Sequence, residues 1–241
     1  PRSTLFPYTT LFRSGEIQRV LPTVFGRGYQ LDFAYRQPPN LEGIVSWWPG
    51  DGNASDVVDG NHGTLVGSAA YGPGIVGTAF VLNGQRGSGV PVGLATNLQS
   101  PDFTIEAWIK RSSPSVASFD QVIGPGGVIY ARGFGGPSFA LFDNGDLFLT
   151  QVGIGWTSTG TGITDTNWNH VAITKSGDTV VFYLNGVPYL APPYDPPFVF
   201  SSEAAIGARP DNGFSNPLYG SIDEPAYYNR VLSAEIARAH A

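Results

Sequence analysis

Apolar and polar side chains alternate in several short stretches of the chain after residue 41. The alternation is unbroken in residues 103–110 and recurs in residues 168–175 and 179–184. A period of two places apolar side chains on one face of a β-strand and polar side chains on the other. Residues 176–178 between the last two stretches are Ser-Gly-Asp, which can supply the positive φ angle of a tight turn. We therefore expect two antiparallel strands joined as a hairpin.

Two further sequences predict hairpin turns. Asn185-Gly186 directly follows the stretch 179–184, and Asp143-Asn144-Gly145-Asp146 separates the apolar stretches 139–142 and 147–152. Asn-Gly favours a type I′ turn because that turn needs a positive φ angle at both central residues. Additional strands are expected at residues 44–48, 78–83, 204–208 and 218–229.

The last residues change character and predict a short helix. Ser233 can cap a helix over Ala234–His240, with Glu235 favourably placed in its first turn. Many short antiparallel strands with no helix between them predict an all-β fold, a two-sheet antiparallel β-sandwich (jelly roll) with a short C-terminal helix. A β-propeller would repeat one motif every ~40 residues, and the sequence shows no such repeat.

Composition narrows the possible functions. The 241 residues include 32 Gly and 20 Pro, only 13% are charged, and the formal net charge is -6. No basic cluster is present that could neutralise a phosphate backbone, so we expect no nucleic-acid partner. The chain has no Cys, which excludes disulfides and thiolate metal sites. No apolar run approaches the ~18 residues of a membrane helix, so no membrane span is expected in this fragment.

The start of the chain does not belong to the predicted domain. Residues 4–14 read as the in-frame translation of a short-read sequencing adapter, so residues 1–14 are interpreted as an artefact. Residues 15–40 contain one short alternating run and then Gln37-Pro38-Pro39-Asn40, which we interpret as the tail of a preceding module and a linker. The sandwich domain is predicted to span residues 41–241, with neighbouring domains of the same chain as its immediate partners.

Seven segments in order carry a resemblance to a known family. They begin with Gly43-Ile-Val-Ser-Trp-Trp-Pro-Gly-Asp-Gly and end with Gly220-Ser-Ile-Asp-Glu-Pro-Ala-Tyr-Tyr. The full set is 43–56, 60–64, 77–84, 103–110, 168–174, 183–186 and 220–233. Residues 41–241 thereby resemble the laminin-G-like jelly-roll domains of the concanavalin A-like lectin/glucanase superfamily, which occur in large bacterial surface and secreted proteins. The resemblance implies adjacent N- and C-terminal strands, an extracellular or cell-surface location, and a module that usually has no catalysis of its own.

A glucanase-like glycoside hydrolase is the catalytic alternative within that superfamily. Retaining enzymes need two carboxyl groups ~5 Å apart, which alternate residues of one strand can supply. Asp223 and Glu224 are consecutive, so alternation places them on opposite faces, and Glu106 stands alone among its neighbours. The three histidines are scattered and fit no zinc or nucleophile motif, namely His62, His170 and His240. We therefore expect no enzyme.

Oxygen-rich loops near the start of the domain predict a structural calcium site. Asp51, Asn53 and Asp56 lie in a glycine-containing loop, and a second loop follows at residues 59–61. The topology that the resemblance implies would bring Asp223 beside the first loop. Calcium prefers carboxylate and carbonyl oxygens. The alternative is that these side chains form Asx turns and cap their own backbone.

One sheet face carries the predicted ligand-binding residues Glu106, Trp108, His170 and Tyr183, which alternation places opposite the apolar core. Aromatic rings stack on sugars, and nearby polar groups fix their orientation. The alternative is that a loop covers these side chains. The sequence predicts a non-catalytic extracellular binding or adhesion module for a glycan or an extracellular protein, with a purely structural spacer as the second interpretation.

Overall fold

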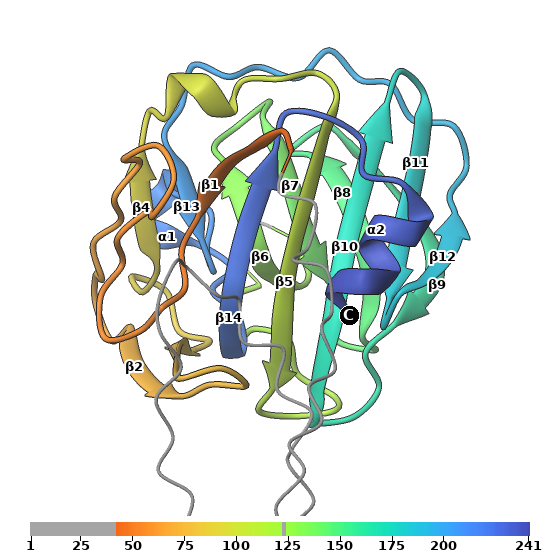
Figure 1. Ribbon diagram of the computed structural model, residues 1–241. Coiled ribbons are helices and arrows are strands. Elements are labelled where there is room, and N and C mark those ends of the chain that lie inside the picture. Colours follow the sequence, from red (N-terminus) through yellow and green to blue (C-terminus); the bar gives the residue numbers. More distant parts are fainter. Residues whose placement is uncertain (1–41, 122–123) are drawn as a thin grey trace, which may run out of the picture. The chain divides into compact units, whose positions relative to one another are not determined.

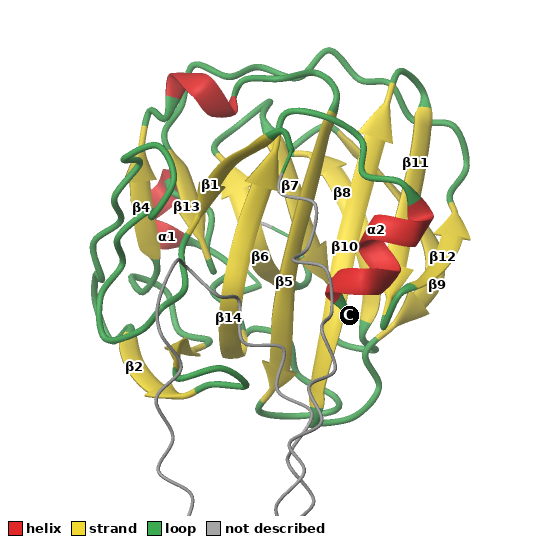
Figure 2. Cartoon of the chain, in the orientation of Figure 1, coloured by secondary structure: helices red, strands yellow, loops and turns green. Residues whose placement is uncertain are grey.

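The computed structural model describes residues 42–121 and 124–241. The chain divides into two compact units, residues 1–40 and residues 41–241. The predictions for residues 1–14 and 15–40 lie outside the described residues. Two antiparallel sheets make up most of the described unit, as predicted, and helices are few and short (Figure 2).

The larger sheet has eight strands, seven of them in the order β12-β11-β10-β5-β14-β3-β2. Strand β1 lies off this path and pairs with β14, so the first and last strands of the unit are neighbours (Figure 1). The strands are β1 (Ile44–Trp47), β2 (Ala70–Pro73), β3 (Thr78–Asn83), β5 (Phe103–Arg111), β10 (Trp168–Ser176), β11 (Thr179–Leu184), β12 (Val187–Leu190) and β14 (Tyr219–Tyr228).

The smaller sheet has six strands in the order β4-β13-β6-β7-β8-β9. They are β4 (Val90–Gly93), β6 (Gly127–Arg132), β7 (Pro137–Leu141), β8 (Asp146–Gln151), β9 (Gly155–Gly162) and β13 (Ala204–Ile206). Short helical segments connect or follow the strands, namely the 3-10 turn η1 (Thr96–Leu98), α1 (Asp211–Phe214) and α2 (Ala234–His240). None of the helices within residues 42–121 and 124–241 is long and apolar enough to cross a membrane.

The core fills the space between the two sheets. Ile105 of β5 and Ile173 of β10 lie opposite each other in the register and are almost fully buried. Across the sandwich, the rings of Phe182 and Phe139 are 6.2 Å apart between centroids. The apolar positions of the alternating pattern therefore face the second sheet, which confirms the predicted two-layer packing.

The predicted turns also form. Asn185 and Gly186 have φ angles of 49° and 76°, as a type I′ turn requires. Gly145 in the other turn has φ 95°, and a Cβ atom there would lie 1.9 Å from the carbonyl oxygen of Ile163. This close approach, as well as the φ angle, restricts the position to glycine. The predicted helix begins after Ser233, whose side chain accepts a hydrogen bond from the backbone of α2.

Four strands were not predicted, β2, β4, β6 and β9. Strand β6 is buried at every position, so its sequence Gly-Val-Ile-Tyr-Ala-Arg shows no alternation of apolar and polar residues. Strand β9 is an edge strand with the sequence Gly-Trp-Thr-Ser-Thr-Gly-Thr-Gly, which resembles a loop in composition. Period-two patterns detect strands whose apolar and polar side chains alternate, and neither of these two sequences alternates.

Arg132 of β6 ties two distant loops to the sheet. Its guanidinium is fully buried and donates hydrogen bonds to the carbonyl oxygens of Leu94 (3.1 Å) and Ala95 (2.8 Å). It also donates to the carbonyl oxygens of Phe200 (3.3 Å) and Ser202 (2.7 Å). Carbonyl dipoles therefore solvate this charge inside the protein.

Candidate functional site

The predicted ligand-binding residues meet on the outer face of the larger sheet, beneath α2. The Glu106 carboxylate accepts a hydrogen bond from the Tyr228 hydroxyl at 2.8 Å, and Nδ1 of His240 lies 2.8 Å from it. Nε2 of His170 lies 3.7 Å from the same carboxylate. Burial alone would raise the pKa of Glu106, but its partners His240, His170 and Tyr228 hold it below the usual value. Burial lowers the pKa of His170 to about 4.

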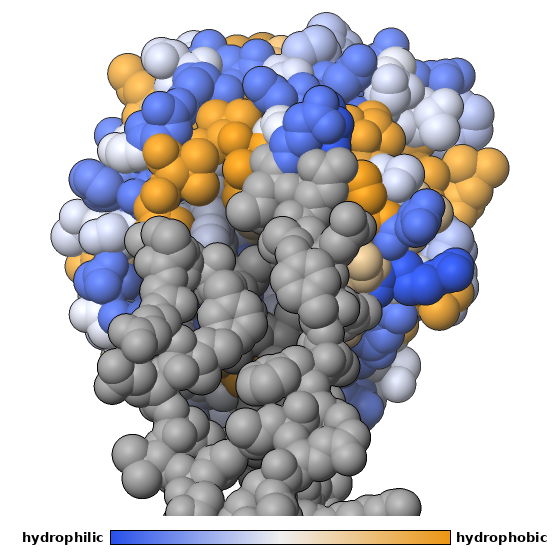
Figure 3. Space-filling view, viewed as in Figure 1, coloured by the Kyte–Doolittle hydropathy of each residue, from blue (hydrophilic) through white to orange (hydrophobic). Residues whose placement is uncertain are grey.

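The remaining two predicted residues lie on the same face, where Tyr183 is buried and Trp108 is partly buried. The Trp108 and His170 rings meet edge-on with centroids 5.3 Å apart. Tyr183 is only 4% exposed because Ala237 of α2 packs against it. Hydrophilic side chains face the solvent where α2 lies in Figure 1 (Figure 3). The structure thus brings the four residues together but places α2 over this face. With α2 in place, this sheet face is not the open ligand surface that the alternating sequence suggested. Alternation within a strand carries no information about a helix that packs over the sheet.

The predicted calcium ligands separate into two groups. The Asp56 carboxylate is buried and accepts four hydrogen bonds, from the backbone of Trp47, Val58 and Asn61 and from the Ser46 hydroxyl. All four donors lie in the same or the adjoining segment of the chain. Asp56 therefore organises its own loop, and binding an ion would break these bonds.

Asn53 belongs to the same group. Its side-chain oxygen accepts a hydrogen bond from the backbone N–H of Ser55 at 2.9 Å, and its amide nitrogen donates to the carbonyl of Asp51. This is the Asx-turn arrangement that was the alternative to calcium. For Asp56 and Asn53 the structure therefore favours the alternative, because local backbone donors satisfy both side chains.

The carboxylates of Asp51 and Asp223 both accept hydrogen bonds from the backbone at the turn that joins β2 to β3. One oxygen of Asp223 accepts hydrogen bonds from the backbone N–H groups of Ile75 (2.7 Å) and Val76 (3.0 Å). Asp51 accepts from the backbone N–H of Thr78 at 2.9 Å. Asp223 is fully buried, and its other oxygen, Oδ1, has no hydrogen-bond partner in the structure. A buried carboxylate oxygen without a donor is energetically unfavourable, so this atom needs a partner.

Glu224 lies near Asp51 and Asp223. Alternation had placed Glu224 on the opposite face of the strand from Asp223. The register of β14 shifts between Asp223 and Ala226, and Glu224 has φ 53° within this bulge. Its carboxylate accepts a hydrogen bond from Nε1 of Trp47. Burial raises the pKa of Asp223 to about 6 and that of Glu224 to about 7, and the charge of Asp51 adds to both shifts. Pro225 was the available signal, because proline inside a strand marks a bulge.

Side chains alone do not form a metal cage here. Within residues 42–121 and 124–241, no three His, Cys, Asp or Glu side chains are grouped so that they could hold a metal ion. Any calcium ion at Asp51 and Asp223 would therefore need backbone carbonyl oxygens or water to complete its shell of six to eight oxygens.

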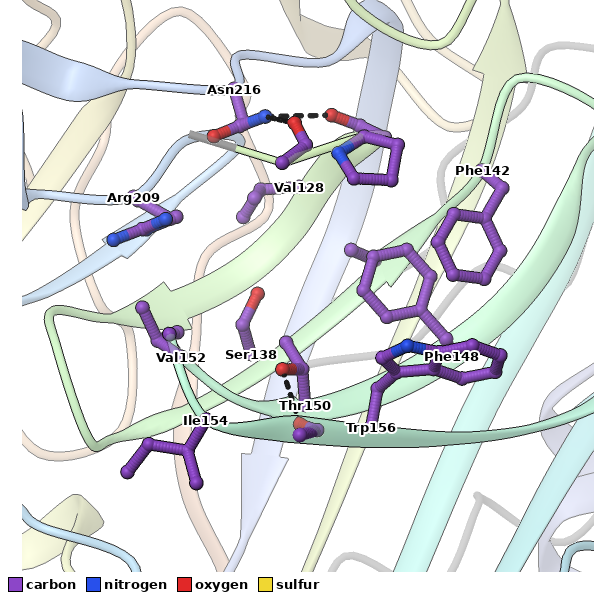
Figure 4. A pocket seen from close by; sticks show the side chains of 16 residues that line it. Val128, Ser138, Phe142, Phe148, Thr150, Val152, Ile154, Trp156, Arg209 and Asn216 are labelled. Atoms are coloured by element: carbon purple, nitrogen blue, oxygen red, sulfur yellow. Dashed lines mark hydrogen bonds between the residues drawn. The ribbon is translucent and has the colours of Figure 1, made fainter. Parts of the chain in front are cut away.

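A pocket of about 250 Å³ lies on the outer face of the smaller sheet (Figure 4). Its floor is formed by residues of β6, β7 and β8 that alternate with core positions, such as Val128, Ala140 and Thr150. Aromatic rings form one wall. Phe142 and Phe148 stack with centroids 4.0 Å apart, and Trp156 of β9 meets Phe142 edge-on at 5.3 Å. Trp156 is 60% exposed, so its ring is available to a ligand.

Polar groups gather at the other end of the pocket. The Asn216 amide nitrogen donates to the carbonyl oxygens of Asp120 (3.0 Å) and Gly124 (2.7 Å), which fixes the orientation of the amide. Its oxygen is buried and has no hydrogen-bond partner. Arg209 lies on the same side in Figure 4 and is bound by both oxygens of Asp211, at 2.8 and 3.0 Å. The pocket therefore has an aromatic end and a polar end.

The segment that carries the polar end has an unusual backbone. Asn212, Phe214 and Asn216 all have positive φ angles, of 54°, 58° and 52°. Such conformations are unfavourable for residues other than glycine and persist only where surrounding contacts enforce them. Here the backbone N–H of Arg209 bonds to the carbonyl of Ser215 at 2.9 Å and closes the loop. Asn adopts this region more readily than most residues, so Phe214 is the most strained of the three.

The described lining of the pocket is free of acids. None of the 16 described residues that line it carries a carboxylate. Sequence analysis missed the site because two of its four strands, β6 and β9, were not predicted, and because its polar end lies on a loop. The exposed Trp156 in a Gly- and Thr-rich segment was the one local signal.

Comparison with known proteins agrees with the fold. A laminin G family model, described as the concanavalin A-like lectin/glucanases superfamily, matches residues 83–237, more than half of the chain. The chain belongs to the concanavalin A-like lectin/glucanase superfamily. The search of curated proteins gave no match.

Solved structures share the superfamily fold at low sequence identity. Domain 4 of AbnA, an extracellular arabinanase from Geobacillus stearothermophilus, is 21% identical with a TM-score of 0.63, covering 81% of this chain and 97% of that domain. The receptor-binding domain of botulinum neurotoxin type G is 13% identical with a TM-score of 0.61, covering 83% of this chain and 51% of the other. Trypanosoma rangeli sialidase is 16% identical with a TM-score of 0.58, covering 83% of this chain but only 33% of the enzyme.

Proposed function

We propose that this domain is a non-catalytic carbohydrate-binding module that acts outside the cell as part of a longer multidomain chain. The pocket beside Trp156 carries the proposal. An exposed aromatic ring, a buried acceptor without a donor on Asn216, and a nearby Arg209 form the combination that sugars require. The ring offers a stacking surface for the apolar face of a sugar, and the polar groups orient its hydroxyls.

One similar solved domain supports a glycan ligand and an extracellular setting. AbnA domain 4, of which nearly the whole length aligns, is described in complex with arabinotriose and belongs to an extracellular enzyme. The pocket volume of about 250 Å³ lies below the ~300–1,000 Å³ of sites for drug-sized ligands, so it suits one sugar ring rather than a long chain segment.

The positions of the acids support binding without catalysis. Hydrolysis of a glycosidic bond needs a pair of carboxyl groups across the bond. The described lining of the pocket has none, and Glu106 is held by Tyr228 and His240 beneath α2. Asp223 and Glu224 come close together only at the β14 bulge, where backbone and Trp47 donors hold them.

The proposal includes a structural calcium ion held by Asp51 and Asp223. The unpartnered Oδ1 of buried Asp223 supports the fit, because a cation would satisfy it. Calcium would supply positive charge among carboxylates that otherwise repel one another, and Glu224 lies within range of that repulsion. By binding Asp51 and Asp223, the ion would fasten the loop after β1 to the last strand.

The test is a glycan array followed by calorimetric titration of the best ligand. We expect Trp156→Ala to weaken binding at least about tenfold through loss of ring stacking, with little change in melting temperature. The matched control is Leu190→Ala, because Leu190 is 71% exposed on β12 of the other sheet. EDTA should lower the melting temperature of the protein.

Three results would overturn parts of the proposal. Failure of the folded protein to bind any glycan on the array would favour a structural spacer or a protein ligand. If Leu190→Ala lost as much glycan affinity as Trp156→Ala, the pocket would not be the binding site. A melting temperature that neither EDTA nor added calcium changes would rule out the ion.

A further inference from the structure

The pocket carries an unbalanced set of charged groups. Arg209 is the only cation among its described lining residues, and no carboxylate lines it. Arg209 is itself only 7% exposed, so water screens its charge weakly. The nearest counter-charge, Asp211, lies outside the lining and is shared, because it also accepts a hydrogen bond from the backbone N–H of Phe134 at 3.0 Å.

Asp211 fixes the guanidinium of Arg209 without using all of its donors. The two hydrogen bonds to Asp211 come from Nε and Nη2. The third nitrogen, Nη1, makes no hydrogen bond in the structure, yet it is not one of the buried unpartnered atoms. Nη1 is therefore accessible. A guanidinium has five N–H donors in a planar fork, so its Nη1 and Nη2 edge remains able to bind a second carboxylate through two parallel hydrogen bonds.

The remaining pocket features set the shape of a matching ligand. The aromatic wall of Phe142, Phe148 and Trp156 lies across the pocket from Arg209 and Asn216 (Figure 4). A ligand that fills the pocket therefore presents an apolar ring face at one end and, at the other, an acceptor for Arg209 and a donor for the Asn216 oxygen. A carboxylate uses the arginine fork better than a hydroxyl does, because its two oxygens match the fork geometry.

We propose that the pocket prefers glycans whose terminal residue is a sugar acid, with the carboxylate of that residue bound by Arg209. This inference rests on the proposed carbohydrate-binding function and names its ligand class. Asp211 is the competing anion in this proposal, since it binds Nε and Nη2 of Arg209 and leaves Nη1 for the ligand. The ring of the sugar acid stacks on Trp156.

The experiment compares an acid with its own neutral form. Trigalacturonic acid, and any acid-terminated glycan bound on the array, are titrated calorimetrically against the intact protein beside their methyl esters. The esters keep the ring and remove the charge. We expect the acid to bind about 10- to 100-fold more tightly, the range for charge-assisted hydrogen bonds. Arg209→Gln should abolish this preference, and Arg209→Lys should keep only part of it.

Two further variants make the result decisive. Arg238→Gln removes an equal charge from the exposed face of α2 and should leave the preference unchanged. Asp211→Asn removes the competing anion, so acid binding should be retained or tightened even if Arg209→Gln fails to fold. A thermal melt of each variant identifies misfolding.

The outcomes separate this inference from the proposed function. Neutral esters that bind as tightly as the acids would overturn the preference for sugar acids and leave carbohydrate binding intact. Loss of acid binding in Asp211→Asn, with the melting temperature preserved, would also overturn it, because the carboxylate would then not depend on Arg209 in the way proposed. Absence of any glycan binding by the folded protein would overturn both.

Discussion

In calcium-free buffer, the acids of the β14 bulge should destabilise the protein as the pH rises. Burial raises the pKa of Asp223 to about 6 and that of Glu224 to about 7. Both values exceed those of unfolded chains, ~3.9 and ~4.3. The folded state therefore binds these protons more tightly. The contribution of these two protons to the free energy of unfolding is fully present below about pH 4 and is lost as the pH rises through 6 and 7. The variant Asp223→Asn/Glu224→Gln removes this dependence.

The size of the effect follows from the two shifts. Between pH 5 and pH 8, Asp223 loses its proton over about one pH unit and Glu224 over about two, and each unit corresponds to about 1.4 kcal/mol. The sum of about 4 kcal/mol treats the two groups as independent and neglects solvent screening. Halving it gives about 2 kcal/mol, or roughly 4–8 °C in melting temperature for a domain of this size.

The protonation of His170 changes the stability in the opposite direction, so its effect must be separated from that of the two acids. Burial lowers its pKa to about 4, so the unfolded state takes up this proton first as the pH falls from 6.5. His170 thus adds stability as the pH rises from 4 to 6.5, which masks the acids in the wild-type profile alone. The difference between wild type and Asp223→Asn/Glu224→Gln cancels this contribution, because His170 is present in both.

The assay is thermal unfolding with EDTA at pH 5, 6, 7 and 8. We expect the variant to gain about 2 kcal/mol on the wild type across this range. Asp178→Asn/Glu203→Gln is the control, since it removes two exposed acids. Adding millimolar calcium at pH 8 should stabilise the wild type and not the Asp223 and Glu224 variant. A wild-type-minus-variant difference that stays constant from pH 5 to pH 8 would refute the reasoning that these acids share a buried, repulsive site.

Three further predictions concern the fold. Arg132→Met should lower the free energy of unfolding by about 3–5 kcal/mol in urea titration, because it leaves buried carbonyl groups without hydrogen-bond donors. A loss below about 1 kcal/mol would contradict this. Gly145→Ala should destabilise far more than Gly177→Ala, since a Cβ meets the Ile163 carbonyl at 1.9 Å only at the first site; equal melting temperatures would count against it. Ser233→Ala should cost about 1 kcal/mol of local stability, read as faster hydrogen exchange confined to α2.

The strands that sequence analysis predicted share one physical property. Strands β5, β10 and β11 each turn apolar side chains toward the core and mostly polar or aromatic side chains toward the outer face, so their sequences alternate with a period of two even though much of the outer face is buried. Strand β6 is buried on both faces and β9 lies at an edge, so no such alternation exists for them. The turns were predictable for a different reason, because the required positive φ angles restrict Asn185, Gly186 and Gly145 to a few residue types.

The candidate sites were less predictable because they depend on contacts between distant segments. The oxygen-rich loop around Asp56 was visible locally, and local backbone donors satisfy most of it. The pairing of Asp51 with Asp223 needed the adjacency of first and last strands, which only the family resemblance supplied. Glu224 required the bulge, and the pocket around Arg209 required a left-handed loop and two unpredicted strands.

The two outer faces of the sandwich differ in what covers them, and this difference points to the smaller sheet for ligand binding. On the larger sheet, α2 brings Ala237 onto Tyr183 and His240 onto Glu106, so this face is covered, although Nδ1 of His170 and Nε2 of His240 are buried without a hydrogen-bond partner. On the smaller sheet, Trp156 stays largely exposed and the Asn216 oxygen stays without a donor. Both are unfavourable in a protein that binds nothing there, since an exposed ring gains no burial and a buried acceptor loses its water. A sugar that stacks on the ring and donates to the acceptor resolves both at once.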